Sequence, residues 1–479
     1  MRSIATGAML PSSQSRMRHV SYRYRSDIMI IKNEHELLSH GERDARTAAL
    51  DIADAAVSAM NCETATRSLV RLDGDELRVG DDTFDLSQFR NVYVIGAGKA
   101  TYPVAKALED VLGDRLTDGV IIVKHGESRR LSSIDVIEAG HPLPDQAGVE
   151  GVERLLEMAN TAGKLDVIFC IITGGASALM PFPVDSVSLD DLRTLNEMLL
   201  LSGAPIEDIN AVRKHVSQIK GGFLAQILHP AHIVNLILID EVAGKPWGPT
   251  IPDPTTFSDA KASLVRHGLW DRVPASVRDY IDRGLQDPSM ETPFPEGDSF
   301  IRTYTHVIGD NTMLCDAALT RALSMDLNAL VLTSEIEGES SDIGIALASI
   351  AREVLSHGRP CSPPCVLIAG GETTVTITDD DHGEGGPNQE VALGAATKLA
   401  GTSDIAFCAI GTDGTDGPTD IAGGIVDGTT MQRAREAGVD IYAHLGRHDA
   451  SGALVKMGDA IYTSPTETNV MDLYLVVIV

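Results

Sequence analysis

Residues 91–101 read NVYVIGAGKAT, an apolar run that stops at a glycine-rich loop. An apolar run without polar alternation is typical of a strand buried on both faces, as in a parallel sheet covered by helices. Glycines directly after such a strand allow a tight turn into a covering helix. The stretch therefore predicts the strand–loop–helix unit of an α/β fold.

Similar runs recur along the chain, separated by helical stretches. The further segments that read as buried strands are 119–123, 167–173, 232–240, 329–334, 365–370 and 405–411. Ahead of them, residues 34–61 carry apolar side chains at helical spacing and predict a long amphipathic helix packed on a sheet. We expect α/β architecture with parallel strands and helices on both faces.

The length of the chain predicts two domains. With 479 residues, 43% of them hydrophobic, it can form two cores. The proline-rich stretch 287–299 interrupts the rhythm of strands and is a candidate linker. We expect a first domain over 34–286 and a second, smaller α/β domain over 300–479. Residues 1–33 read as a disordered leader, or residues 1–28 precede the natural start at Met29.

The charge of the chain excludes some classes of partner. The net charge is −29 and the pI about 4.7, so nucleic acid and anionic membranes would be repelled. No apolar run approaches the roughly 20 residues that cross a bilayer. The 43 Asp exceed the 25 Glu, and the 28 Arg exceed the 11 Lys. This composition favours a halophilic protein, and a merely acidic mesophile is the alternative.

Six thinly spread cysteines indicate a reduced, cytoplasmic protein.

Most candidate functional residues lie in five loops that directly follow predicted strands: GAGKAT, TGGASA, DEVAGK, GGETT and GTDGTDG. The carboxyl ends of strands in an open α/β sheet face a common crevice, where helix N-termini attract anions. The residues predicted to bind phosphate in the first two loops are Gly96, Gly98, Lys99, Gly174, Gly175 and Ser177. GAGKAT fits neither a Walker A motif nor a dinucleotide fingerprint, because Thr101 stands where the third glycine would be. A tight turn with a solvated lysine is the alternative.

Two further segments carry charged side chains. NAVRKHVSQIKGG (210–222) places Arg213, Ser217 and Lys220 on one helix face, which favours an anionic ligand or a solvated, ion-paired face. GTDGTDGPTD (411–420) offers Asp413 and Asp416, which could hold Mg²⁺, accept a proton, or form plain Asp-Gly turns. Asp240 and Glu372, also at strand ends, could add metal contacts. His141 in GHPLPD is expected to shape a turn rather than to catalyse.

Eight motifs in order resemble the glycerate 2-kinase family, of the type with a C-terminal MOFRL domain. They are VIGAGKA, AGHPLPDQ, INAVRKHVSQIKGG, GPTIPDPTTFSDA, GGETTVT, GGPNQE, GTDGTDGPTD and TSPTETNVMDL. The likeness runs from about residue 40 to the C-terminus. It implies a Rossmann-like first domain, a smaller α/β second domain and an active site in the cleft between them. The implied reaction transfers the γ-phosphate of ATP to the 2-hydroxyl of D-glycerate, with Mg²⁺ or another divalent cation.

The resemblance also implies roles for single residues. Matches to the family motifs point to Lys99, Asp413 and Asp416 as catalytic residues, while the positions of Asp240, Glu372 and Asp413 after strands make them the expected metal ligands. The residues that the resemblance implies for substrate or phosphate binding, beyond the loop residues above, are Arg213, Lys214, Lys220 and Asn388. Three departures from the family pattern affect ligand binding: Pro387 in GGPNQE replaces a cation, Glu467 replaces a glycine, and the loop 241–247 is short.

Two other functions stay open on the sequence. One is an NAD(P)-dependent hydroxypyruvate reductase, against which the missing third glycine and the missing ribose-binding acid count. The other is a non-catalytic ligand-binding protein on the same fold. ATP and D-glycerate are the expected small-molecule partners, with a homodimer as one candidate assembly.

Overall fold

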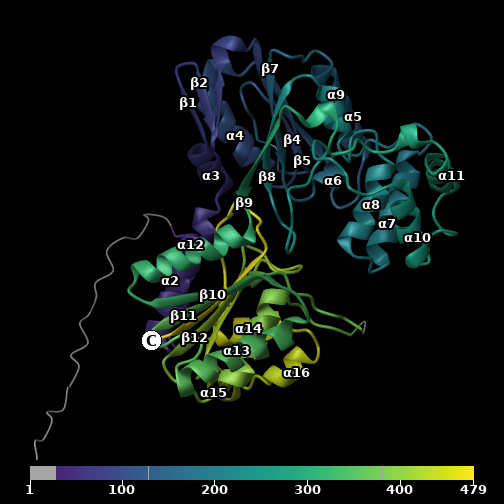
Figure 1. Cartoon of the computed structure of the whole chain (residues 1–479). Coiled ribbons are helices and arrows are strands. Elements are labelled where there is room, and N and C mark those ends of the chain that lie inside the picture. Colours follow the sequence, from purple (N-terminus) through teal and green to yellow (C-terminus); the bar gives the residue numbers. More distant parts are fainter. Residues whose placement is uncertain (1–28, 128, 379–380) are drawn as a thin grey trace, which may run out of the picture.

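The computed structural model describes residues 29–127, 129–378 and 381–479, so the predicted leader over residues 1–28 lies outside the described chain. Two six-stranded sheets form two bodies joined near strand β9 (Thr303–Gly309) (Figure 1). A small antiparallel sheet lies beside the first body, with strands β1 (Val70–Asp73), β2 (Glu76–Val79) and β3 (Asp82–Asp85). No helix in the described residues is both long and apolar enough to span a membrane.

The first large sheet is entirely parallel, in the order β6-β5-β4-β7-β8-β9. Its remaining strands are β4 (Asn91–Ala97), β5 (Asp118–Lys124), β6 (Asp135–Ala139), β7 (Asp166–Ile172) and β8 (His232–Leu238). All seven residues of β7 are buried. Helices α4 (Thr101–Leu112) and α5 (Gln146–Ala159) pack on strands of this sheet. The predicted parallel α/β sheet is confirmed here.

The second sheet is mixed, in the order β10-β11-β15-β12-β13-β14. Its strands are β10 (Asn328–Ile336), β11 (Cys365–Gly371), β12 (Ile405–Gly411), β13 (Gly423–Asp427), β14 (Ala460–Ile461) and β15 (Asp472–Ile478). Among the neighbouring strand pairs of this sheet, β10 and β11 alone pair in parallel, and β15 runs antiparallel between β11 and β12. The expectation of parallel strands is wrong for this sheet, because a strand buried on both faces reads the same in either direction.

Helices cover both faces of the second sheet. Helices α13 (Ser340–His357) and α14 (Pro387–Leu399) pack together on one face. Helices α2 (Arg43–Ala59) and α12 (Asn311–Ser324) pack on the other face (Figure 1). The C-terminal segment adds α15 (Thr430–Glu436), α16 (Ile441–Leu445) and α17 (Ala450–Met457).

Two elements lie across the predicted domain boundaries. The single helix expected over 34–61 is divided into α1 (Glu34–Leu37) and α2, and α2 covers the second sheet rather than the first. In the other direction, β9 lies in the segment expected for the second domain but pairs with β8 of the first sheet. An amphipathic helix pattern shows which face is buried, not which sheet buries it. The boundaries themselves stay a prediction.

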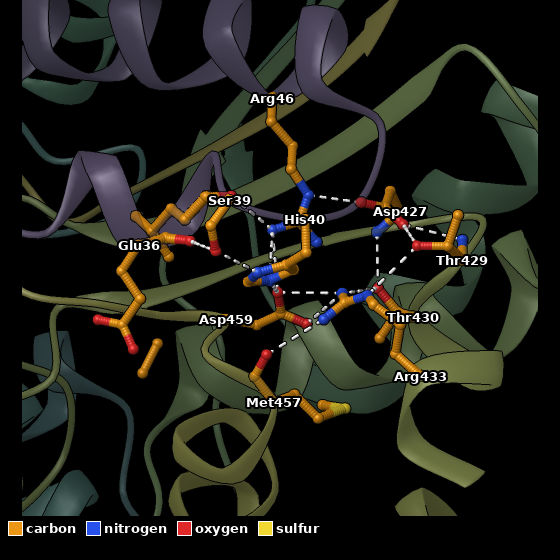
Figure 2. Close-up of polar contacts among 12 residues, drawn as sticks. Glu36, Ser39, His40, Arg46, Asp427, Thr429, Thr430, Arg433, Met457 and Asp459 are labelled. Atoms are coloured by element: carbon orange, nitrogen blue, oxygen red, sulfur yellow. Dashed lines mark hydrogen bonds and ion pairs between the residues drawn. The ribbon is translucent and has the colours of Figure 1, made fainter. Parts of the chain in front are cut away.

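Buried charges attach α2 to the second sheet (Figure 2). The Arg46 side chain is completely buried, and its Nε donates to Asp427 Oδ2 at 2.5 Å. Its Nη1 donates to Asp459 Oδ1 at 2.9 Å, and Arg433 Nη2 donates to the other oxygen of Asp459 at 2.7 Å. At Gly41, with φ of +73°, a Cβ would lie 2.1 Å from Asp427 Oδ2, so only glycine fits this approach.

A helical lobe projects from the first sheet (Figure 1). It contains α7 (Leu189–Leu201), α8 (Ile206–His215), α10 (Phe257–Arg266) and α11 (Ala275–Gly284), which share a hydrophobic core of their own. Glu291, from the predicted linker 287–299, accepts a hydrogen bond from His215 Nε2 of this lobe at 2.7 Å. The remaining helices are α3 (Cys62–Leu69), α6 (Ala176–Leu179) and α9 (Phe223–Leu228).

Candidate active site

The loops after β4 and β7 interlock at the carboxyl edge of the first sheet. Gly98 has φ of +136°, and a Cβ there would lie 2.0 Å from Thr173 Oγ1. At Gly96, a Cβ would lie 2.5 Å from the carbonyl oxygen of Ile171. Both glycines therefore allow the first loop to pack closely on the strand and loop of its neighbour.

The backbone donors of the first loop are used within the protein. Gly98 N donates to Ile122 O at 3.2 Å, Lys99 N to Gly174 O at 2.8 Å, and Ala100 N to Thr173 Oγ1 at 3.1 Å. These amides are not offered to a phosphate, so binding by Gly96 and Gly98 stays a prediction with no geometric support. The Lys99 side chain, in contrast, is exposed and has no hydrogen-bond or ion-pair partner among the described residues.

The second loop is better arranged for an anion. Within the described chain, the backbone N–H groups of Gly174, Gly175 and Ser177 have no hydrogen-bond acceptor. Gly175 has φ of +83°, and a Cβ there would lie 2.9 Å from the His141 ring and 3.5 Å from Lys99 Cγ. The loop thus brings donor groups, the lysine of the first loop and His141 together.

A cavity of about 290 Å³ opens beside this loop. Its polar lining includes Ser177, Arg213, Lys214, Lys220, Asp240 and Glu241. Leu200, Ile206 and Trp247 add apolar surface. Six predicted residues meet in this cavity: Gly175, Ser177, Arg213, Lys214, Lys220 and Asp240. It combines cations and carboxylates, as required for an anionic substrate that must also lose a proton.

The cations come from α8 and the turn after it. Arg213 Nε donates to Asn196 Oδ1 at 2.8 Å, and Lys214 Nζ pairs with the buried carboxylate of Asp253 at 3.1 Å. Lys220 Nζ donates to the carbonyl oxygen of Met180 at 2.6 Å. Burial, together with the nearby Arg213 charge, lowers the pKa of Lys220 to about 7. Lys220 is therefore a cation whose charge is costly until an anion binds beside it.

The carboxylates form a second electrostatic group. Burial raises the pKa of Asp240 to about 6, against the opposing charge of Lys99. Burial and the charge of Asp240 raise the pKa of Glu241 to about 7. The Glu372 side chain is open to solvent, yet the surrounding protein and the charges of Asp240 and Asp413 raise its pKa. Carboxylates from both sheets thus lie within electrostatic reach of one another.

These carboxylates do not form a ready-made metal cage. In the part of the chain that the structure describes, no three His, Cys, Asp or Glu side chains are close enough to hold one metal ion together. The predicted ligands Asp240, Glu372 and Asp413 therefore stay a prediction. Asp413 is exposed, and its Oδ1 accepts from Thr415 N at 3.0 Å.

Asp416 and Asn388 are buried in the second body and do not line the cavity. Asp416 Oδ1 accepts from Asn388 N at 3.0 Å and Oδ2 from Gln389 N at 2.9 Å, which caps the N-terminus of α14. Asn388 Nδ2 donates to the buried Asp472 at 2.7 Å. Both side chains are engaged in structural bonds, so the geometry supports neither as a direct contact with substrate.

Comparisons with known proteins identify the family of the chain. Two family models match, "Domain of unknown function (DUF4147)" over residues 48–282 and "MOFRL family" over residues 365–472. The glycerate 2-kinase of Pyrococcus horikoshii is 40% identical over 440 residues, which is 91% of this chain and 98% of that protein. The chain belongs to the glycerate 2-kinase family.

Other members of the glycerate 2-kinase family are also similar over most of their length. The D-glycerate 2-kinase of Thermotoga maritima is 38% identical, covering 84% of this chain and 94% of that protein. A crystal structure of a glycerate kinase from Thermotoga maritima superposes with a TM-score of 0.79 at 36% identity, covering 90% of this chain and 99% of that one. The likeness therefore extends to the arrangement of both bodies.

Two departures from the glycerate 2-kinase motifs have a structural explanation. Pro387 occupies the first turn of α14, where proline costs no hydrogen bond. Glu467 has φ of +55°, a conformation that glycine adopts more easily. Its Oε1 pairs with Arg129 Nη1 at 2.9 Å, and the Arg129 guanidinium lies 4.2 Å from the centre of the Tyr102 ring. Glu467 thus links the second body to the first.

Sequence reasoning missed three residues of this glycerate 2-kinase site. His141 lines the cavity rather than merely shaping a turn, and its position just after β6 is the signal that could have shown it. Burial, followed by the charges of Lys99 and Lys124, lowers the pKa of His141 to about 4, so the ring is neutral at pH 7. In the sequence Glu241 stands out only as part of a short loop, and no sequence signal marks Asn196.

Proposed function

We propose that this chain phosphorylates the 2-hydroxyl of D-glycerate with ATP, giving 2-phosphoglycerate and ADP. The observation that carries the proposal is the cavity in which Arg213 and Lys220 meet Asp240 and Glu241, beside the anion-binding loop at Gly175. Its relatives of known name, glycerate 2-kinases that align over nearly their whole length, support the same reaction.

The cationic wall is suited to the carboxylate of glycerate. Arg213 is held in place by Asn196, and Lys220 gains stability as a cation when an anion approaches. Lys214 is already paired with Asp253, so its charge is partly neutralised. Arg213 and Lys220 would therefore bind the substrate carboxylate.

The reaction needs a proton acceptor for the attacking hydroxyl and positive charge near the phosphoryl group that is transferred. The 2-hydroxyl oxygen attacks the γ-phosphorus, the new P–O bond forms, and the bond to the β-phosphate oxygen breaks as ADP leaves. Glu241, in the wall of the cavity, would take the hydroxyl proton. Lys99 and the free N–H groups of the Gly174–Ser177 loop would stabilise the charge on the transferred group.

The carboxylates fit a divalent cation, although they do not enclose one. Magnesium is commonly held by one or two carboxylates, with water and phosphate oxygens completing the shell. Asp240 and Glu372 would hold it, and Asp413 lies within electrostatic reach of Glu372. When bound, the ion neutralises charge between the β- and γ-phosphates.

The habitat of the protein is part of the proposal. The acidic composition and the six free thiols support a cytoplasmic enzyme of a salt-loving organism. Assays should therefore include molar potassium chloride as well as dilute buffer.

A pair of coupled assays tests the proposed reaction. ADP release that requires both D-glycerate and Mg²⁺ is expected, and Arg213→Ala should raise KM for glycerate while kcat changes little. Oxidation of NADH with hydroxypyruvate, without glycerate-dependent ADP release, would instead support a reductase. The structure disfavours the reductase, because the β5 strand ends in Lys124 where a ribose-binding acid would stand.

A further inference from the structure

Two lysines, Lys99 and Lys124, lie at the same edge of the first sheet. Strands β4 and β5 are parallel, with Ala97 opposite Ile122, so Lys99 and Lys124 each lie two residues beyond a paired position. The hydrogen bond from Gly98 N to Ile122 O keeps this alignment past the end of β4. Both lysines therefore lie at the edge of the sheet that bears the active site, with Lys99 N turned toward β7 to donate to Gly174 O at 2.8 Å.

The surroundings of the two lysines agree with this placement. The cations of Lys99 and Lys124 both act on His141, whose pKa burial and these charges lower. Both also act on Glu127, where they oppose the effect of burial on its pKa. The two ammonium groups therefore share the same surroundings on the side where His141 contacts Gly175.

Neither lysine is neutralised by a direct partner. Within the described residues, neither Lys99 nor Lys124 makes a side-chain hydrogen bond or ion pair, and both are exposed. Lys106 of the same domain, in contrast, forms an ion pair with Asp110. An anion with several linked charges can contact two unpaired cations at once and gain attraction from both. If one phosphoryl group of a polyphosphate contacts Lys99, the phosphoryl group linked to it can contact Lys124.

We propose that Lys124 binds the polyphosphate chain of the nucleotide, as a second cation beside Lys99. The proposal rests on the proposed kinase function and adds a residue to its nucleotide site. It would add a cation to the nucleotide site, whereas Pro387 stands where the family motif has one. The chemistry required of the ligand is a run of at least two linked phosphoryl groups.

Calorimetric titration of the full chain tests the role of Lys124 directly. Wild type, Lys124→Gln, Lys124→Arg and Lys164→Gln are titrated with MgATP, AMP and inorganic tripolyphosphate at one salt concentration. Lys164 is the matched control, because it is exposed and lies before β7, at the opposite edge of the same sheet. Lys124→Gln should weaken MgATP and tripolyphosphate binding by about tenfold, as for a lost charge-assisted contact.

The AMP titration and the Lys124→Arg variant show whether Lys124 acts on the linked phosphoryl groups. AMP binding should change less than twofold in Lys124→Gln, because AMP lacks linked phosphoryl groups, and Lys124→Arg should restore most of the MgATP affinity. Equal losses for AMP and MgATP, or wild-type MgATP affinity in Lys124→Gln while Lys99→Gln loses it, would overturn the proposal. A wild type that binds MgATP through Lys124 but does not phosphorylate D-glycerate would refute the proposed function alone.

Discussion

Lys99 and Lys220 differ in their surroundings, and the difference determines what each can do. Lys99 is exposed, unpaired and carried on a loop whose amides are all used in packing. Lys220 lines the cavity near Arg213, is partly exposed, and donates to the carbonyl oxygen of Met180. The first is placed to meet a mobile phosphoryl group, and the second to hold a small anion in the cavity.

Replacing Lys99 should affect the chemical step and not the fold. Lys99→Ala is expected to lower kcat by roughly 10²- to 10³-fold, the usual loss when one group that stabilises transition-state charge is removed. The melting temperature should stay within experimental error, because the side chain makes no contact that the fold needs. A kcat close to wild type in the ADP-release assay would remove Lys99 from the mechanism.

The charge of Lys220 should appear in the pH profile. Its pKa of about 7 means that the free enzyme loses this cation as the pH rises through neutrality. The value of kcat/KM for glycerate should therefore fall above about pH 7, since this ratio reports ionisations of the free enzyme. Lys220→Arg keeps its charge, so the alkaline fall should shift upward or vanish. An unchanged alkaline limb in Lys220→Arg would show that another group causes it.

Residue patterns predicted the cations better than the carboxylates. Arg213 and Lys220 share a helix-spaced cluster, and such a cluster in an acidic chain points to an anion whatever the fold. Asp413 and Asp416 share one motif, yet only the folded chain shows that Asp416 meets the end of α14 and Asp413 does not. Spacing in the sequence alone cannot distinguish a carboxylate that caps a distant helix from one that is free to bind a ligand.

At the scale of the element, α14 begins at a cap from another segment. Gly386 precedes the helix and carries no side chain, so Asp416 supplies the acceptors for the first free N–H groups. Gln389 Nε2 adds a further bond to Asp416 Oδ2 at 3.0 Å. The GTDGTDG motif is thus divided between the structural carboxylate of Asp416 and the exposed carboxylate of Asp413.

The two aspartates of this motif should separate in mutagenesis. Asp416→Ala removes the cap and leaves buried donors unpaired, so unfolding free energy should fall by about 1–3 kcal/mol. Asp413→Asn should leave stability unchanged and lower kcat, if Asp413 assists the metal. Denaturant unfolding and steady-state kinetics on both variants check this. A stable, inactive Asp416→Ala enzyme would return Asp416 to the mechanism.

Strand direction was the part of the second sheet that its sequence left open. The apolar run of β12 reads as a buried strand in the sequence, whereas β15 is not among the predicted strands. The central position of β15 makes most neighbouring pairs of the sheet antiparallel. Direction depends on how segments far apart in the chain pair. In the first sheet the runs of β4, β5, β7 and β8 read as buried strands in the sequence, whereas β6 and β9 are not among the predicted strands. Helical crossover connections favour parallel neighbours, as found here.

At the scale of the whole molecule, the N-terminal helix belongs to the second body. α2 packs on the second sheet through an apolar face and through the buried Arg46. The chain therefore passes from the second body to the first and back again through β9. The lining of the cavity comes from the first body and its helical lobe.

Removal of the Arg46 charge should destabilise the second body. Arg46→Ala leaves Asp427 buried without its cation and Asp459 with fewer, so we expect a loss of about 3–5 kcal/mol in unfolding free energy. Arg43→Ala on the same helix is the control, because Arg43 is exposed. Thermal and denaturant unfolding measure both. Equal stability of the two variants would show that the buried network does not hold α2.

The position of the transferred phosphate tests the central claim most directly. The full chain is incubated with D-glycerate, ATP and Mg²⁺ in high salt, and the product is examined by ³¹P and ¹³C NMR. We predict phosphorus coupling to the C2 carbon of glycerate, with ADP formed in equal amount. Phosphorylation at C3, or no glycerate phosphorylation while hydroxypyruvate is reduced with NADH, would contradict the account.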